Sequence, residues 1–172
     1  AQPWDNLKFD LDGVAEVQRK FFGTLYNTYS FFALYANIDG FKYAEDDIPL
    51  AERPEIDRWI LSELNTLILQ VQDGMDNFEP TRAYRPIQEF VNDKLSNWYV
   101  RLCRRRFWKG EYGQDKIAAY QTLYTCMATV TKLGAALAPF FMERLFQELN
   151  AVDCLQKGAS VHLTDFPKAN KK

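Results

Sequence analysis

Apolar side chains recur every three or four residues along most of this chain, which is the spacing of one face of an α-helix. The first stripe follows Asp12, a residue type that caps helix N-termini well, and continues to about Asn37. Its members are Val14, Val17, Phe21, Leu25, Phe32 and Tyr35. The pattern therefore predicts one long helix over roughly 12–37.

The segment 39–54 has no hydrophobic period, and its acidic side chains and prolines are typical of a loop. We expect its acidic residues to be solvated: Glu45, Asp46, Asp47 and Glu52. A second helix is predicted from Pro54, because proline is favoured in the first turn of a helix. Its core stripe consists of Ile56, Ile60, Leu64, Leu67, Val71 and Phe78.

A third helix is predicted from Pro80 to Trp108, with a kink or a delayed regular part at Pro86. Gly110 and Gly113 then interrupt the helical pattern before a fourth helix begins. The core stripe of this fourth helix consists of Ile117, Leu123, Tyr124, Met127, Val130 and Leu137.

Pro139 ends or kinks the fourth helix, and the residues that follow it, up to Asn150, predict a short fifth one. Four long helices and a short fifth, joined mostly by short connections, indicate an all-α fold, an antiparallel bundle. In the tail, 161–163 reads as a short extended piece, and the lysine-rich end is expected to be frayed. The predicted parts of the chain are an extended lead-in at 1–11, the helical bundle at 12–152 and an exit segment at 153–172.

The composition limits the classes of protein to which the chain can belong. With 172 residues, 47% of them hydrophobic and 26% charged, it is a globular domain of ordinary size. No stretch approaches the ~18 apolar residues of a membrane span, and the N-terminus does not resemble a signal peptide, so we expect a cytoplasmic protein. The three cysteines Cys103, Cys126 and Cys154 are far apart and odd in number, which disfavours a disulfide framework or a zinc site.

The sequence contains none of the short motifs that mark common active sites. A dinucleotide or phosphate-binding glycine loop, a nucleophile elbow and a zinc-protease helix are all absent. A di-iron bundle would need Glu-x-x-His motifs on two helices, whereas the lone His162 lies outside every predicted helix. We therefore expect no catalytic residue, no metal site and no cofactor within this chain.

The segment 101–109 carries five positive charges and no acid. At 100° per residue, its basic side chains share one arc of the third helix with nearby polar and aromatic residues: Lys94, Asn97, Arg101, Arg104, Arg105 and Trp108. A neighbouring arc is expected to face the core: Val91, Leu95, Trp98, Tyr99 and Leu102. Arg106 falls on the core side, which predicts a structural ion pair or a carbonyl cap.

Two interpretations of this basic arc remain open from the residues alone. Arginines beside an exposed aromatic ring provide phosphate binding and base stacking, the combination that contact with RNA requires. Cations near a helix C-terminus are also favoured by the helix dipole alone, by ~0.3–1 kcal/mol each.

The net charge of −2 by itself argues against a nucleic-acid partner, but the distribution of the charges along the chain changes this conclusion. Residues 82–116 contain nine basic and four acidic side chains, or +5. The rest of the chain has 12 basic and 19 acidic side chains, or −7, and the two parts restore −2. The sequence therefore predicts a polarised bundle with one basic helix.

Four blocks of the sequence resemble the anticodon-binding helical domain of the isoleucyl-tRNA synthetases. They are LYNTYSFFALYANIDGF at 25–41, LSNWYVRLCRRRFW at 95–108, LAPFFMERLFQELN at 137–150 and SVHLTDFP at 160–167. The blocks occur in the family's order, and PWDNLKFD resembles the stretch just after the family's catalytic half. Leu102 and Cys103 depart from the more polar residues expected there. The valyl and leucyl enzymes share the bundle but are not expected to carry the arginine-rich block.

This resemblance implies a domain that binds the anticodon arm of tRNA-Ile, within a monomeric ligase. The expected tRNA-binding residues are Arg101, Arg104, Arg105, Trp108 and Lys109, with Lys94, Asn97 and Asn27 as further candidates. The family's catalytic and C-terminal domains, absent from this sequence, would then be partners of the bundle. ATP with Mg²⁺ would belong to the catalytic domain, and zinc only to the C-terminal region.

Two alternatives from other classes remain. A helical protein-interaction module would use the basic strip to bind an acidic partner, and it predicts an exposed apolar patch beside the arginines. An enzyme bundle that carries a cofactor would need ionisable groups directed into the core, whereas a purely apolar interior would argue against it.

Overall fold

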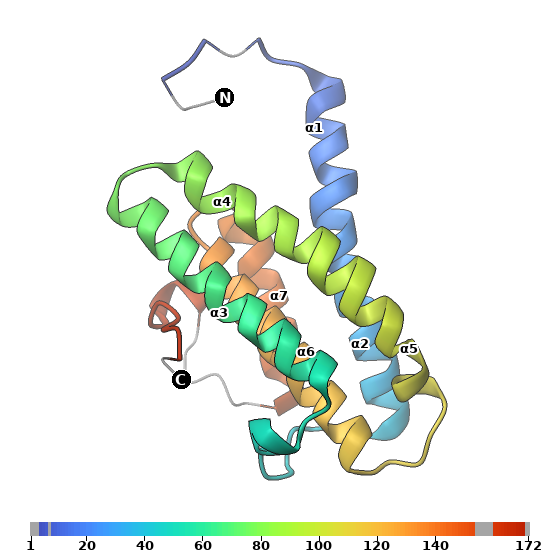
Figure 1. Cartoon of the computed structure of the whole chain (residues 1–172). Helices are drawn as coiled ribbons and strands as arrows, with labels where there is room; N and C mark the ends of the chain where they lie inside the picture. Colours follow the sequence, from blue (N-terminus) through green and yellow to red (C-terminus); the bar gives the residue numbers. More distant parts are fainter. Residues whose placement is uncertain (1–3, 7, 154–159, 171–172) are drawn as a thin grey trace.

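The computed structural model describes residues 4–6, 8–153 and 160–170, and within them all regular structure is helical (Figure 1). The predicted all-α bundle is thus confirmed. The first long helix comprises α1 (Leu11–Val17), a π-helical segment (Gln18–Phe22) and α2 (Gly23–Asp39). The second is α3 (Glu55–Asp76). The third comprises α4 (Pro80–Glu89), a π-helical segment (Phe90–Val100) and α5 (Arg101–Trp108). The last two are α6 (Gln114–Gly134) and α7 (Pro139–Asp153).

The first helix begins slightly earlier than expected. Asp10, not Asp12, is its N-cap: the Asp10 side chain accepts a hydrogen bond from the backbone N–H of Asp12 at 3.1 Å. The helix ends where Gly40 adopts a left-handed conformation with φ 71°, which glycine adopts without a steric cost. The predicted helix is therefore correct in type but extends two residues further at its C-terminal end.

The N-terminal part of this helix extends beyond the other helices of the bundle (Figure 1). Val14 and Val17, both expected in the core, are 54% and 50% exposed because none of the other described helices covers them. The buried part of the stripe begins at Phe21 and continues through Leu25 and Phe32.

The core is built around α6, which buries side chains on most of its circumference. Tyr120 contacts the rings of Phe32, Phe41 and Phe107 at centroid distances of 6.0, 4.8 and 5.0 Å. These rings come from α2, the following loop and α5, so one tyrosine joins three parts of the chain. Leu137, expected to continue the α6 stripe, lies after the helix ends and is 45% exposed.

The loop between α2 and α3 has no regular structure apart from a 3₁₀ turn at Leu50–Glu52. It is fixed to α6 by Gln121, whose amide donates to the carbonyl oxygen of Asp46 and accepts from the N–H of Ile48, both at 3.0 Å. Of the acidic side chains expected in solvent, Glu45 is half-buried and accepts a hydrogen bond from the hydroxyl of Tyr112.

The exit segment returns to the bundle. The carboxylate of Glu143 on α7 accepts hydrogen bonds from the hydroxyl of Ser160 at 2.9 Å and the N–H of Val161 at 2.8 Å. Residues Val161–Leu163 form a 3₁₀ turn, so the expected extended piece is wrong. The side chain of Ser160 caps this turn, which favours the 3₁₀ turn over an extended conformation. Cys154, Lys171 and Lys172 lie outside the described residues. Before them the chain is held on the bundle and is not frayed, since the N–H of Asn170 donates to the side chain of Asn65 at 2.8 Å. No described helix is long and apolar enough to cross a membrane.

Helices α3 and α4 approach each other closely at Gly74. A Cβ atom built on Gly74 would lie 2.7 Å from the backbone nitrogen of Ala83 and 2.8 Å from its Cα. The turn that follows includes Phe78, which has φ 56° and is 87% exposed. The expected core stripe of α3 therefore ends at Val71, since the chain leaves the helix before Phe78.

We predict that Gly74→Ala lowers the free energy of unfolding by about 1–3 kcal/mol, because the added methyl group must displace α4 backbone atoms. Chemical denaturation monitored by circular dichroism measures this change. Gly110→Ala is the matched control, since no atom lies within 4 Å of its added methyl group. A Gly74→Ala protein as stable as the wild type would contradict the close approach.

Candidate nucleic-acid interface

The position of the basic residues depends on the shape of the third helix. Its buried side chains recur at intervals of four: Ala83, Ile87, Val91, Leu95, Tyr99, Cys103 and Phe107, each at most 1% exposed. On a regular α-helix this repeat drifts by ~40° per step, or ~240° over six steps. The π-helical segment Phe90–Val100 absorbs the drift, because its hydrogen bonds enclose more residues per turn. The helix continues through Pro86, the position at which a kink or a delayed start was expected.

This change of period corrects two core predictions. Trp98 and Leu102 were expected on the core face, but they are 61% and 55% exposed. Val91, Leu95 and Tyr99 are fully buried, as predicted. A helical wheel at 100° per residue placed Trp98 and Leu102 incorrectly on the core face, because the wider turns of the π-helical segment rotate them away from the core. The four-residue repeat of apolar side chains was visible in the sequence and was the signal that could have identified this.

Four basic residues lie on the exposed side of the third helix and just after it. We call Arg101, Arg104, Arg105 and Lys109 the basic strip. All four are exposed, and no ion pair between described residues involves them. Relative to Arg101 at ~100° per residue, they span an arc of ~140°, from Arg104 at about −60° to Lys109 at about +80°. The strip therefore places four exposed cations on neighbouring positions of the third helix and its C-cap.

The other predicted site residues differ in their availability. Trp108 is 62% exposed within the arc of the strip, and Asn97 is exposed one turn before Arg101. Lys94 forms an ion pair with Glu63 of α3, so it is not a free cation like those of the strip. Asn27 is exposed on α2. Helix α2 runs alongside α5 there, since the rings of Phe31 and Phe107 meet edge to face at 5.2 Å.

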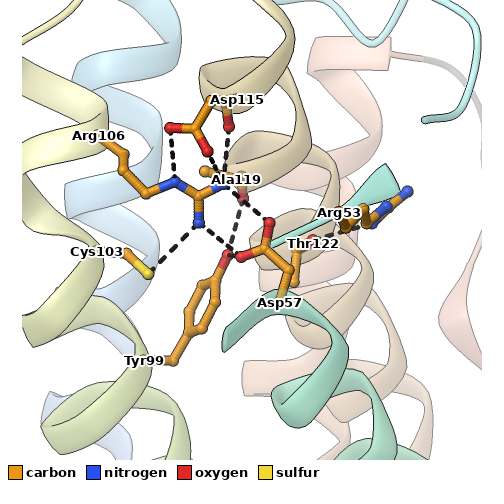
Figure 2. Close-up of polar contacts among 8 residues, drawn as sticks. All are labelled: Arg53, Asp57, Tyr99, Cys103, Arg106, Asp115, Ala119 and Thr122. Atoms are coloured by element: carbon orange, nitrogen blue, oxygen red, sulfur yellow. Dashed lines mark hydrogen bonds and ion pairs between the residues drawn. The ribbon is translucent and has the colours of Figure 1, made fainter. Parts of the chain in front are cut away.

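Arg106 does not belong to the strip; it is directed into the bundle, as expected for a structural ion pair (Figure 2). Its guanidinium donates to both carboxylate oxygens of Asp57, at 2.6 and 2.9 Å. It also donates to the side chain of Asp115 at 3.0 Å and to its carbonyl oxygen at 2.8 Å. Asp57 is fully buried and also accepts a 2.8 Å hydrogen bond from the hydroxyl of Tyr99. This network connects α3, α5, α6 and the π-helical segment.

The protonation of the network follows from burial and from the ion pair. Burial and the neighbouring Asp57 carboxylate hold the pKa of Tyr99 well above its ordinary value, so its hydroxyl remains a donor. Burial alone would lower the pKa of Arg106, but the hydrogen bonds with Asp57 reverse this and raise it. Burial also raises the pKa of the thiols of Cys103 and Cys126. Both thiols are therefore protonated at neutral pH and poorly suited to nucleophilic chemistry or metal binding.

A purely apolar interior would have argued directly against an enzyme bundle. The observed interior does not meet this condition. It contains Asp57 and Lys116, but each has a partner: Asp57 pairs with Arg106, and Lys116 pairs with Asp39 at 3.0 Å. Among the described residues, no cluster of three or more His, Cys, Asp or Glu side chains could hold a metal ion. The buried charges therefore stabilise the bundle through one another.

A shallow hollow of about 430 Å³ lies at the C-terminal end of the strip, between α5 and α6. Arg105 and Lys109 line it, together with the acidic residues Glu111 and Asp115. The exposed arginines beside Trp98 and Leu102 also meet the condition stated for a protein-interaction module. Geometry alone thus allows either an RNA or a protein partner for the strip.

Comparison with known proteins distinguishes these classes. Residues 57–172 match the family model described as the anticodon-binding domain of tRNA ligase. The chain is 66% identical over 171 residues to the isoleucine–tRNA ligase of Cytophaga hutchinsonii, covering 99% of this chain and 15% of that protein. It is 64% identical over 168 residues to that of Bacteroides thetaiotaomicron (98% and 14%), and 61% over 171 residues to that of Porphyromonas gingivalis (99% and 15%). The chain thus spans about 15% of the length of these relatives.

We predict that Arg106→Ala lowers the free energy of unfolding by about 3–5 kcal/mol, because it leaves the buried charge of Asp57 without its cationic partner. Asp57→Ala should cost less, because Arg106 keeps its contacts with Asp115. Arg144→Ala is the matched control, since Arg144 is exposed and its one ion pair with a described residue is the surface pair with Glu148; little change is expected there. Chemical denaturation of the two single variants and the double variant measures the coupling. Single-variant losses that add fully in the double variant would contradict a coupled pair.

Proposed function

This chain belongs to the family of anticodon-binding domains of tRNA ligases, and we propose that it recognises the anticodon arm of tRNA-Ile within an isoleucine–tRNA ligase. One observation carries the proposal: the basic strip consists of four exposed cations that form no ion pair with a described residue. Such a group of cations suits a polyanion, and it occurs in a chain 61–66% identical to isoleucine–tRNA ligases of three organisms.

Each residue of the interface has a distinct task in this proposal. Arg101, Arg104, Arg105 and Lys109 bind phosphate groups, and the guanidinium groups do so with two parallel hydrogen bonds. Trp108 stacks on an unpaired base. Three further residues contribute weaker contacts: Lys94, Asn97 and Asn27. Lys94 must exchange its partner Glu63 for a phosphate, which makes its contribution smaller than that of a free cation.

The rest of the proposed ligase performs the chemistry. Its catalytic domain joins isoleucine to tRNA-Ile with ATP and Mg²⁺, while this bundle holds the distant anticodon arm. Residues 1–11 lead from the catalytic half into the bundle at 12–152, and 153–172 lead towards a C-terminal region that binds zinc. We propose a monomeric, cytoplasmic enzyme in which this chain itself contributes no catalytic residue. Affinity of the isolated bundle is modest, because the C-terminal region supplies further anticodon contacts.

We predict that the chain binds tRNA-Ile with a log–log salt slope of about −3 to −4, the value for four or five neutralised phosphates. Replacing Arg101, Arg104 and Arg105 together by alanine removes three of these contacts, so the slope falls to about −1. Titration of labelled tRNA-Ile by fluorescence anisotropy at several salt concentrations measures both slopes.

A control variant distinguishes the effect of the strip on binding from the effect of the total charge. Replacing Arg19, Arg82 and Arg144 by alanine changes the total charge equally but leaves the strip intact, and it should preserve most of the affinity. Equal losses in the two triple variants would contradict the assignment of the strip. Salt-insensitive binding by the wild type would contradict the whole proposal.

A further inference from the structure

Trp98 is a large aromatic side chain that the wider turns of the third helix leave at the surface. It is 61% exposed, although an aromatic ring contributes most to a core or an interface when its large apolar surface is buried. Leu102, one turn later, is also exposed. The two form an apolar border along one edge of the basic strip.

Among the described residues, one aromatic ring contacts that of Trp98, and it supports Trp98 from α3. The half-buried ring of Trp59 lies 6.4 Å from that of Trp98, at an interplanar angle of 55°. At this angle Trp59 does not lie flat on Trp98, so it restricts the ring without covering it face to face. The pair is therefore a partly fixed aromatic platform at the surface between α3 and the third helix.

The platform lies beside free cations. Arg101 and Leu102 follow Trp98 by three and four residues, and Arg105 follows it by seven; these are the spacings of neighbours on one helix face. Arg101 and Arg105 thus lie between the exposed ring of Trp98, at one edge of the strip, and that of Trp108, within the arc of the strip. Two rings flanking two arginines provide stacking and phosphate contacts in alternation, which single-stranded nucleic acid requires.

The charges favour an RNA occupant over an apolar protein surface. A protein that covered Trp98 and Leu102 would also remove water from Arg101 and Arg105, which have no acidic partner among the described residues. Burying such cations without a counter-charge is costly. A nucleotide that stacks on the ring supplies the counter-charge itself, because its phosphate is joined to the base through the sugar and therefore lies close to it.

We propose that Trp98, supported by Trp59, is a second base-stacking site, which binds an unpaired base of the RNA while Arg101 and Arg105 bind its phosphates. This inference rests on the proposed function and extends it to a residue that the sequence pattern had assigned to the core. It requires an RNA with an unpaired base, as in a loop or a bulge.

The test uses two RNA probes and four variants of the 172-residue chain. One probe is a hairpin with the anticodon stem and loop of tRNA-Ile; the other is a blunt duplex of the same stem. Trp98→Ala removes the ring, Trp98→Leu keeps apolar bulk without an aromatic face, and Trp98→Phe keeps a ring. Phe140→Ala is the control, since Phe140 is 90% exposed on α7, away from the strip.

We expect Trp98→Ala and Trp98→Leu to weaken hairpin binding by about 5- to 100-fold and to leave duplex binding unchanged. Trp98→Phe and Phe140→Ala should bind both probes almost as the wild type does. Circular dichroism of each variant verifies the helical fold, which an exposed side chain should not affect.

Three results would overturn the inference. Wild-type affinity of Trp98→Ala for the hairpin would show that no base stacks there, even if the arginine triple variant loses binding and the proposed function stands. Equal losses on hairpin and duplex would show that the ring does not read unpaired bases. Retained affinity in Trp98→Leu would show that apolar bulk suffices, as for a protein contact. If the wild type binds neither probe, the proposed function itself fails.

Discussion

Asp57 has no exposed surface, and its carboxylate is held by the guanidinium of Arg106 and the hydroxyl of Tyr99. Removing two charges from water costs several kcal/mol each, and the cost is offset only where the geometry satisfies both groups. Here each oxygen of Asp57 accepts a hydrogen bond from Arg106, and further donors of Arg106 reach Asp115 and the sulfur of Cys103. The arrangement fixes the rotation of α5 relative to α3 and α6. The faces that α5 presents to solvent follow from that rotation.

The rotation separates arginines that are adjacent in the sequence. Arg106 enters the bundle, whereas Arg104 and Arg105 remain in solvent with Arg101. The helix can satisfy the ion pair and also bury Val91, Leu95 and Tyr99 only because its middle part is π-helical. The same wider turns leave Trp98 and Leu102 outside the core. One buried ion pair and one change of helical period thus determine both the core and the composition of the surface.

This surface explains how a chain of net charge −2 can bind a polyanion. Most acidic side chains lie outside the segment 82–116, and the buried charges within that segment neutralise one another or reach partners on other helices. Four cations that form no ion pair with a described residue, Arg101, Arg104, Arg105 and Lys109, are grouped on the third helix and directly after it. Anticodon-binding domains of tRNA ligases, the family to which this chain belongs, meet such a partner. Local charge, and not the total, therefore decides what this bundle can bind.

The sequence by itself determined the all-α class, the succession of helices and the inward position of Arg106, because hydrophobic period, proline and glycine act over a few residues. It also predicted the exposed arginines, since they share a helix face at any period close to 3.6. It did not determine the exposure of Trp98, Phe78 or Val14, nor the partner of Arg106. Those depend on how far a helix extends past its neighbours, where the chain leaves it, and how its turns widen to fit facing helices. Only tertiary packing decides these features, because the free energy that selects them comes from contacts between residues far apart in the chain.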